Sequence, residues 1–204
     1  MAKPLGIDFV GGAVGHRYRF GGGRGQALPR AVGLRAGEPL RVVDATAGLG
    51  RDAFLLASLG AEVVLIERSP EVHAALAEAL ARAHTASPEY AAIVGRMRLM
   101  LGDARELLPG LAPEVVLVDP MHPPRGKSAL VKEEMRTLRA LVGNDPDAGE
   151  LMRVALATAS RRVVLKWPLR APPLPDLPAP SHSIGGKTTR YDVFVTGPRN
   201  AASG

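Results

Sequence analysis

The segment DATAGLGRDA, residues 44–53, decides the fold, because it follows the apolar run Leu40–Val43 and precedes a helix-compatible stretch. This order predicts a buried strand, a tight glycine turn and a helix that begins near Arg51. Gly48 and Gly50 can adopt backbone angles that other residues avoid, and they let the chain approach a ligand closely. The first N–H groups of the helix have no partners within it, so they point toward that ligand. The segment therefore predicts a nucleotide-type cofactor site.

Asp44, at the carboxyl end of the predicted strand, distinguishes between cofactors. A carboxylate there suits the cationic amino-acid end of S-adenosylmethionine and would repel the pyrophosphate of a dinucleotide. Two alternatives stay open. The hexad 48–53 also satisfies the dinucleotide pattern G-x-G-x-x-[GA], and a turn packed only for its shape would need no ligand. We predict that the turn binds S-adenosylmethionine.

The composition limits the class of protein. The chain has 204 residues, 46% hydrophobic residues, no cysteine and a net charge of +6. This length fits one domain with a sizeable core. No apolar run reaches the roughly 20 residues that cross a bilayer, and the N-terminus lacks a signal-peptide pattern. Without cysteine there is no disulfide or thiolate metal site. We expect a cytoplasmic protein that has no membrane partner.

Positive charge is concentrated near the N-terminus, where residues 1–41 contain seven Lys and Arg and only two acids. We expect an anionic partner, and nucleic acid first, because guanidinium groups fit phosphates and stack on bases. A bias in genome composition is the alternative. His16–Phe20 interleaves rings and cations between glycines, which suits looped RNA, whereas a hairpin over the sheet edge is the structural alternative. We expect residues 1–38 to form a basic segment packed on or beside a core of residues 39–204.

Apolar runs alternate with helix-compatible stretches along the rest of the chain, which is typical of a parallel sheet with helical crossovers. The expected strands are Leu40–Val43, Val63–Ile66, Met97–Leu101, Val115–Val118 and Arg162–Lys166, closed by an antiparallel pair, Ser181–Ile184 and Tyr191–Thr196. The expected helices begin near Arg51 and at the Ser69 cap, and cover Ser128–Val142 and Ala148–Ser160. Pro168–Pro180 is rich in proline and is expected to be an extended surface loop. The pattern predicts an α/β fold with a mostly parallel sheet and helices on both faces.

Acids follow four of these strands, at Asp44, Glu67, Asp103 and Asp119. The carboxyl ends of the strands form the ligand crevice of an open α/β sheet. S-adenosylmethionine offers such acceptors an ammonium group, a sulfonium, a ribose diol and an adenine amine. We expect Glu67 to accept both ribose hydroxyls and Asp103 to face the adenine amine. The alternative is that these acids only cap the helices that follow them.

The turn that follows the fourth strand, residues 119–123, has the sequence DPMHP and predicts the reacting part of the site. A rigid, proline-bounded turn can hold a carboxylate and backbone carbonyls against a flat ring that carries an exocyclic amine. Two acceptors that hold the N–H bonds of this amine can aim its lone pair at the methyl group. The candidate catalytic residues are Asp119, Pro120 and His122, with a structural role as the alternative for His122. The histidines show no ligand spacing, so no metal is expected.

Five motifs occur in one order between about Leu5 and Thr196. They are DFVGGAVGHRYRFGGGRG, VVDATAGLGRDAF, the pair Glu67-Arg68, VDPMHP with KSALVKEEMR, and VVLKWP. Together they resemble the RsmJ family of bacterial methyltransferases, which modify a guanine N2 in 16S ribosomal RNA. The resemblance implies a class I, Rossmann-like methyltransferase fold, S-adenosylmethionine as the donor and small-subunit ribosomal RNA as the partner. It implies donor contacts from Arg51, Asp52, Glu67, Arg68, Asp103, Ala104 and Asp119.

The residues themselves add Asp44, Gly48 and Gly50 to this donor site. The candidate RNA-binding residues are His16, Arg17, Arg19, Arg24, Lys127, Lys132 and Lys166. The catalytic turn lacks the aromatic residue of the N-P-P-Y pattern found in amino-methylating enzymes, so a base must stack on another ring. The candidate rings are those of His122, Trp167, Tyr18 and Phe20.

We therefore expect methyl transfer from S-adenosylmethionine to the exocyclic N2 of a guanine in 16S small-subunit ribosomal RNA. Two alternatives stay open. One is an amino-methylating enzyme that acts on DNA or a small molecule. The other is a non-catalytic RNA-binding protein, which would have no need for acids at the ends of four strands.

Overall fold

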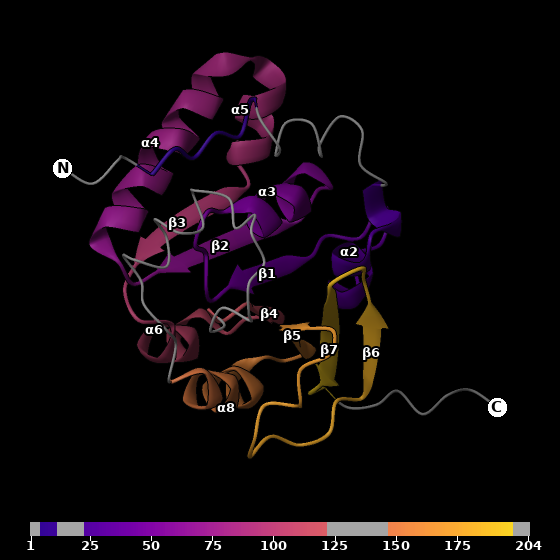
Figure 1. Cartoon of the computed structure of the whole chain (residues 1–204). Helices are drawn as coiled ribbons and strands as arrows, with labels where there is room; N and C mark the ends of the chain where they lie inside the picture. Colours follow the sequence, from indigo (N-terminus) through magenta and orange to yellow (C-terminus); the bar gives the residue numbers. More distant parts are fainter. Residues whose placement is uncertain (1–4, 12–22, 122–146, 198–204) are drawn as a thin grey trace.

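The computed structural model describes residues 5–11, 23–121 and 147–197, which contain one seven-stranded sheet (Figure 1). The strand order is β3-β2-β1-β4-β5-β7-β6. Strands β1 to β5 are parallel, and β7 is antiparallel to β5 and β6. The strands are β1 (Arg41–Asp44), β2 (Glu62–Glu67), β3 (Met97–Leu101), β4 (Val115–Val118), β5 (Arg162–Pro168), β6 (His182–Gly185) and β7 (Thr189–Val195). This arrangement confirms the predicted α/β fold and its antiparallel C-terminal pair.

Helices cover both faces of the sheet (Figure 1). One face carries α2 (Ala27–Val32), α3 (Arg51–Ser58), α4 (Pro70–Ala86) and α5 (Pro88–Val94), and the other carries α6 (Ala104–Leu111) and α8 (Ala148–Thr158). A short 3-10 turn, η1 (Gly23–Gly25), precedes α2. Because side chains alternate along a strand, Val164 packs under the first group of helices and Leu165 under the second.

The predicted strands agree with the structure to within two residues at each end, and Met97–Leu101 and Val115–Val118 have the predicted bounds. The predicted cap of α4 is also confirmed, because the Ser69 hydroxyl accepts a hydrogen bond from the Val72 N–H at 3.3 Å. Beyond the end of β5, the loop up to Pro180 contains no helix or strand, as predicted. The predicted helix Ser128–Val142 lies outside the described residues.

Three short helices were not predicted, for reasons that the sequence makes plain. Helix α2 has six residues and includes Pro29, and α5 begins directly after the Ser87 that ends α4. Helix α6 contains Pro109 followed by Gly110, a pair that normally indicates a turn. In α2 and α6, packing into the core outweighs the weak local preference for a helix. Helix α5 has a start signal of its own, the Ser87 cap followed by Pro88 and Glu89, and packs against α3 and α4.

Residues 5–11 pack against the helices that follow the glycine turn, beside α4 and α5 (Figure 1). Phe9 is 1% exposed, and its ring stacks on that of Phe54 with 5.0 Å between the centroids. Arg82 of α4 donates to the carbonyl oxygen of Ile7 at 2.8 Å, and the Tyr90 hydroxyl of α5 donates to that of Val10 at 3.1 Å. The start of the DFVGG motif is therefore part of the hydrophobic core.

Replacing Phe9 tests this anchorage. Phe9→Ala should lower the free energy of unfolding by about 3–5 kcal/mol, because it leaves a cavity beside Phe54. Urea denaturation measures the change, and Leu101→Ala, at a side chain that is 50% exposed, is the control and should stay within about 0.5 kcal/mol. A loss for Phe9→Ala as small as that of the control would show that residues 5–11 are not part of the folded core.

Candidate active site

The glycine turn lies between β1 and α3, as predicted. Gly48 has φ +50° and Gly50 has φ +66°, both in the left-handed region that favours glycine. The N–H of Gly50 donates to the carbonyl oxygen of Ala47 at 2.8 Å and closes the turn. A Cβ atom on Gly50 would lie 2.9 Å from Leu76 Cδ2 and 3.0 Å from Phe9 Cζ. Gly50 is therefore required by the packing of α4 and Phe9 as well as by its backbone angle.

The four predicted acids lie at the carboxyl ends of four adjacent strands. Across the sheet, Asp103 follows β3, Glu67 ends β2, Asp44 ends β1 and Asp119 follows β4. A cavity opens beside this row of acids. The predicted residues that line the cavity are Gly48, Glu67, Arg68, Asp103, Ala104 and Asp119. Within the part of the chain that the structure describes, Asp44, Gly50, Arg51 and Asp52 do not line it.

Asp44 is a buried carboxyl group in the centre of the row, with 3% of the residue exposed. Its Oδ1 accepts a hydrogen bond from the Thr46 N–H at 3.2 Å. Burial, followed by the charge of Asp52, raises the pKa of Asp44 from 3.8 to about 7, against the lowering effect of the Thr46 hydrogen bond. Near neutral pH this carboxyl therefore changes charge readily.

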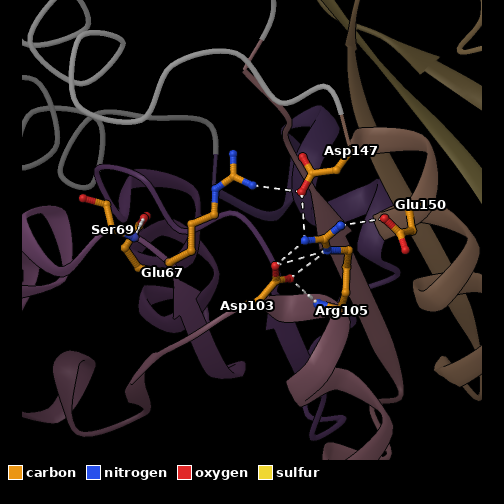
Figure 2. A network of polar contacts seen from close by, with 7 residues as sticks. Glu67, Ser69, Asp103, Arg105, Asp147 and Glu150 are labelled. Atoms are coloured by element: carbon orange, nitrogen blue, oxygen red, sulfur yellow. Dashed lines mark hydrogen bonds and ion pairs between the residues drawn. The ribbon is translucent and has the colours of Figure 1, made fainter.

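Glu67 ties the glycine turn to the start of α4. It is 5% exposed; Oε2 accepts from the Gly48 N–H at 3.0 Å and Oε1 from the Ser69 N–H at 2.8 Å. Figure 2 shows the Glu67–Ser69 contact. Burial raises the pKa of Glu67, and these hydrogen bonds oppose the rise. Each oxygen retains acceptor capacity for a further donor such as a hydroxyl group.

Asp103 caps α6, as the capping alternative predicted for an acid after a strand. It accepts a hydrogen bond from the Arg105 N–H at 2.8 Å, and the Arg105 guanidinium binds its carboxylate at 2.6 Å (Figure 2). Hydrogen bonds from the Arg105 side chain hold the pKa of Asp103 below its usual value. Arg105 also contacts Glu150 at 2.6 Å and Asp147 at 3.4 Å, and Arg68 contacts Asp147 at 3.0 Å.

The sequence analysis did not select Arg105, Asp147 or Glu150. Arg105 could have been found from its place in the first turn after Asp103, where it reaches back to the acid that caps the helix. Asp147 and Glu150 lie at the start of α8, more than 40 residues along the chain from Arg105, and no local pattern connects them. The role of Asp103 toward an adenine amine stays a prediction.

Asp119 lies at the other end of the row, where Thr46 and Lys166 hold it. Its N–H donates to the Thr46 hydroxyl at 2.7 Å, and its Oδ2 accepts from Lys166 Nζ at 2.7 Å. The same ammonium donates to Asp52 Oδ2 at 2.6 Å. Burial lowers the pKa of Lys166, but the charges of Asp119 and Asp52 outweigh it and raise the pKa above its ordinary value. The structure thus gives Lys166 partners within the site, where the sequence predicted a contact with RNA. Pro120 is buried.

Two further candidate residues have partners within the protein. Arg24 is exposed, and its guanidinium donates to the carbonyl oxygen of Leu59 at 2.7 Å. Trp167 is only 7% exposed, and its Nε1 donates to the carbonyl oxygen of Pro172 at 2.8 Å. Trp167 was therefore wrong as a candidate ring for base stacking, because its indole belongs to the core under α6 and α8. The candidates outside the described residues are His16, Arg17, Tyr18, Arg19, Phe20, His122, Lys127 and Lys132.

None of the helices within residues 5–11, 23–121 and 147–197 is long and apolar enough to cross a bilayer. No three His, Cys, Asp or Glu side chains in these ranges are grouped in a way that would hold a metal ion.

Comparison with known proteins identifies the family. The family described as "Putative SAM-dependent methyltransferase" matches residues 1–196. Ribosomal RNA small subunit methyltransferase J of Agrobacterium fabrum is 66% identical over 93% of this chain and 91% of the relative. That of Brucella anthropi is 67% identical over 95% of this chain and 94% of the relative. The chain belongs to the ribosomal RNA small subunit methyltransferase J family.

A solved structure supports the methyltransferase fold. The crystal structure of a SAM-dependent methyltransferase from Neisseria gonorrhoeae is 36% identical, with a TM-score of 0.75, over 98% of this chain and 77% of that chain. Membership of the family confirms the class I methyltransferase fold and S-adenosylmethionine as the methyl donor, both of which the sequence predicted.

The unusual pKa of Asp44 has a measurable effect on stability. Because this pKa is raised from 3.8 to about 7, the folded protein binds more protons than the unfolded chain between these values. Stability should therefore fall as the pH rises through this window, and Asp44→Asn should remove that fall. Between about pH 5 and about pH 8, the variant should gain roughly 2–3 kcal/mol relative to the wild type.

Urea denaturation at the two pH values tests this expectation. Asp176→Asn, at an exposed position in the loop after β5, is the matched control and should follow the wild type. An Asp44→Asn variant whose stability changes with pH as the wild type does would show that Asp44 ionises normally in the folded protein.

Proposed function

We propose that this chain transfers a methyl group from S-adenosylmethionine to the exocyclic N2 of a guanine in 16S small-subunit ribosomal RNA, in the cytoplasm. The observation that carries the proposal is the row of acids at four adjacent strand ends, with Asp119 held in place at one end of it. The names of the relatives from Agrobacterium fabrum and Brucella anthropi support ribosomal RNA as the substrate. A binding protein without catalytic activity would not need this row.

The residues around the glycine turn fit the donor. Glu67 is buried, faces the turn through Gly48 and has acceptor capacity left for the two ribose hydroxyls. Asp103 lines the cavity on the far side of Glu67, in a suitable place for the adenine amine. Asp44 and Asp119 supply the negative charge that favours a cation. The remaining proposed donor contacts are Gly50, Arg51, Asp52, Arg68 and Ala104.

When bound, S-adenosylmethionine supplies an electrophilic methyl group on its sulfonium. The protein contributes position rather than a strong base. The Asp119 carboxylate and the carbonyl of Pro120 accept hydrogen bonds from the guanine amine, which turns its lone pair toward the methyl group. As the amine nitrogen bonds to the methyl carbon, the bond between that carbon and the sulfonium sulfur breaks, and the sulfur leaves as a neutral thioether. The nitrogen then loses a proton, and Asp119 is the acceptor. We include His122 in this turn as a further candidate contact.

RNA binding is assigned to the basic residues outside the donor site. We propose that residues 1–38 are a basic segment on the methyltransferase core and that Arg24, which is exposed, contacts phosphate. Further proposed contacts are His16, Arg17, Arg19, Lys127 and Lys132. Because a duplex hides the guanine N2 group, the target must be unpaired or flipped outward, at a cost of a few kcal/mol.

Glu67 provides a test of the donor site. Glu67→Gln keeps the size of the side chain and replaces one acceptor oxygen with an NH₂ group, so one ribose hydroxyl loses its partner. We expect a loss of about 1–3 kcal/mol in donor binding, or roughly 5- to 150-fold in Kd. Calorimetry with S-adenosylmethionine measures it, and Glu62→Gln, exposed at the other end of β2, is the control. Unchanged affinity in Glu67→Gln, or tighter binding of NAD by the wild type, would contradict the assignment.

Asp119 provides a test of the chemistry. Asp119→Asn keeps the size but turns one acceptor into an NH₂ group that faces the amine's own N–H. We expect the single-turnover rate on 16S RNA that lacks the modification to fall by roughly 100-fold or more. Donor affinity should fall far less than the rate, because other acids of the row also attract the donor. Melting temperature should change little, and Asp176→Asn should keep the wild-type rate. Mapping of the labelled methyl group identifies the target atom.

A near wild-type rate in Asp119→Asn would leave the backbone carbonyls of the turn as the positioning groups. Methylation of DNA or of a small molecule in place of RNA would overturn the proposed substrate.

A further inference from the structure

Lys166 lies on the same face of the sheet as Glu67 and Asp44, the two central acids of the row. Strands β1, β4 and β5 are adjacent, and Val118 is the register partner of Leu165, so the residues that follow them, Asp119 and Lys166, are neighbours across the sheet. Helix α3 covers this face and contributes Asp52. Lys166 Nζ therefore bridges two carboxylates that come from different elements, at 2.6 Å and 2.7 Å.

Exposure increases along this bridge from the interior toward the cavity. The side chain of Asp52 is 12% exposed, that of Lys166 is 24% exposed and that of Asp119 is 39% exposed. Among these three residues, Asp119 lines the cavity. The bridge thus has an inner anchor, a cation and an outer carboxylate that faces the place where substrates bind.

We propose that Lys166 is a positioning residue, which holds Asp119 by its Oδ2 and so orients the carboxylate toward the amine of the target base. The inference rests on the proposed function, because it assigns Asp119 to that amine. Asp52 fixes the lysine from α3, and the Thr46 hydroxyl fixes the backbone of Asp119. Asp119 is therefore held by its backbone N–H and by one carboxylate oxygen before a substrate arrives.

The charge of Lys166 has a second consequence. Among residues 5–11, 23–121 and 147–197, the titratable groups beside Lys166 are Asp44 on β1, Asp52 on α3, Asp119 after β4 and Tyr191, which is the register partner of Lys166 on β7. Without the cation, three neighbouring carboxyl groups would repel one another, and a proton would be retained on one of them. A protonated Asp119 is a poorer acceptor for the amine. Lys166 therefore also favours the ionised form of Asp119.

Lys166→Met removes the cation and keeps an unbranched side chain. In single-turnover methylation near neutral pH we expect the rate to fall roughly 10- to 100-fold. The acid limb of the pH–rate profile should move upward by about one pH unit or more, while the Kd for S-adenosylmethionine changes less than about threefold. Lys166→Arg should restore the acid limb but not the full rate, because its planar guanidinium places the charge differently. Lys187→Met, at an exposed lysine between β6 and β7, is the matched control and should behave as the wild type.

A second measurement does not depend on catalysis. Carboxyl ¹³C NMR of the ligand-free protein, assigned with Asp119→Asn, should show the titration midpoint of Asp119 moved upward in Lys166→Met and unchanged in Lys187→Met. If Lys166→Met does not fold, Lys166→Gln carries the same two measurements. A wild-type rate and acid limb, or an unmoved Asp119 midpoint, would overturn the proposal. So would weaker RNA binding with an unmoved acid limb, which would make Lys166 the phosphate contact predicted from the sequence.

The two proposals fail in different ways. A wild-type protein that binds the donor but does not methylate RNA would refute the proposed function. In that case the NMR titration still decides whether Lys166 controls Asp119, since it uses neither RNA nor donor.

Discussion

The active site depends on how the repulsion among negative charges is offset at the carboxyl ends of the central strands. Parallel strands bring their carboxyl ends together, so acids that end the central strands are forced into proximity. Asp44 is buried there, and the charges of Asp52 and Asp119 add to the effect of burial in raising its pKa to about 7. Lys166 lies between Asp52 and Asp119 and offsets part of this repulsion. The donor is a cation, so the unbalanced negative charge that remains favours its binding.

A second buried carboxylate, that of Glu67, holds the glycine turn in position. Glu67 accepts hydrogen bonds from the N–H groups of Gly48 and Ser69, so one buried side chain fixes both the turn and the first residues at the start of α4. Gly50 then lets Leu76 and Phe9 approach the backbone closely. The donor site is thus continuous with the hydrophobic core, and it includes the residues that begin the DFVGG motif.

Much of this architecture could be predicted from the sequence because it depends on short patterns. The order of strands and helices, the glycine turn and the acids after the strands are all visible in windows of ten residues or fewer. The partners of those acids are not. Lys166 is 47 residues from Asp119 and 114 from Asp52, and its position beside them follows only from the strand order. Helix α6 was missed because Pro109 and Gly110 indicate a turn locally, and packing against the sheet and α8 overrides them.

The contacts of Arg105 connect the two ends of the acid row. At one end, Arg105 holds Asp103, the acid nearest the predicted adenine position, and it also reaches Asp147 and Glu150 at the start of α8. Helix α8 leads into β5, which carries Lys166 to the other end of the row. Since Arg68 shares Asp147 with Arg105, the end of β2 is joined to the same helix. The sheet sets the spacing of the acids, and the ion pairs together with one helix-to-strand connection join the predicted adenine end of the site to the strand that carries Lys166.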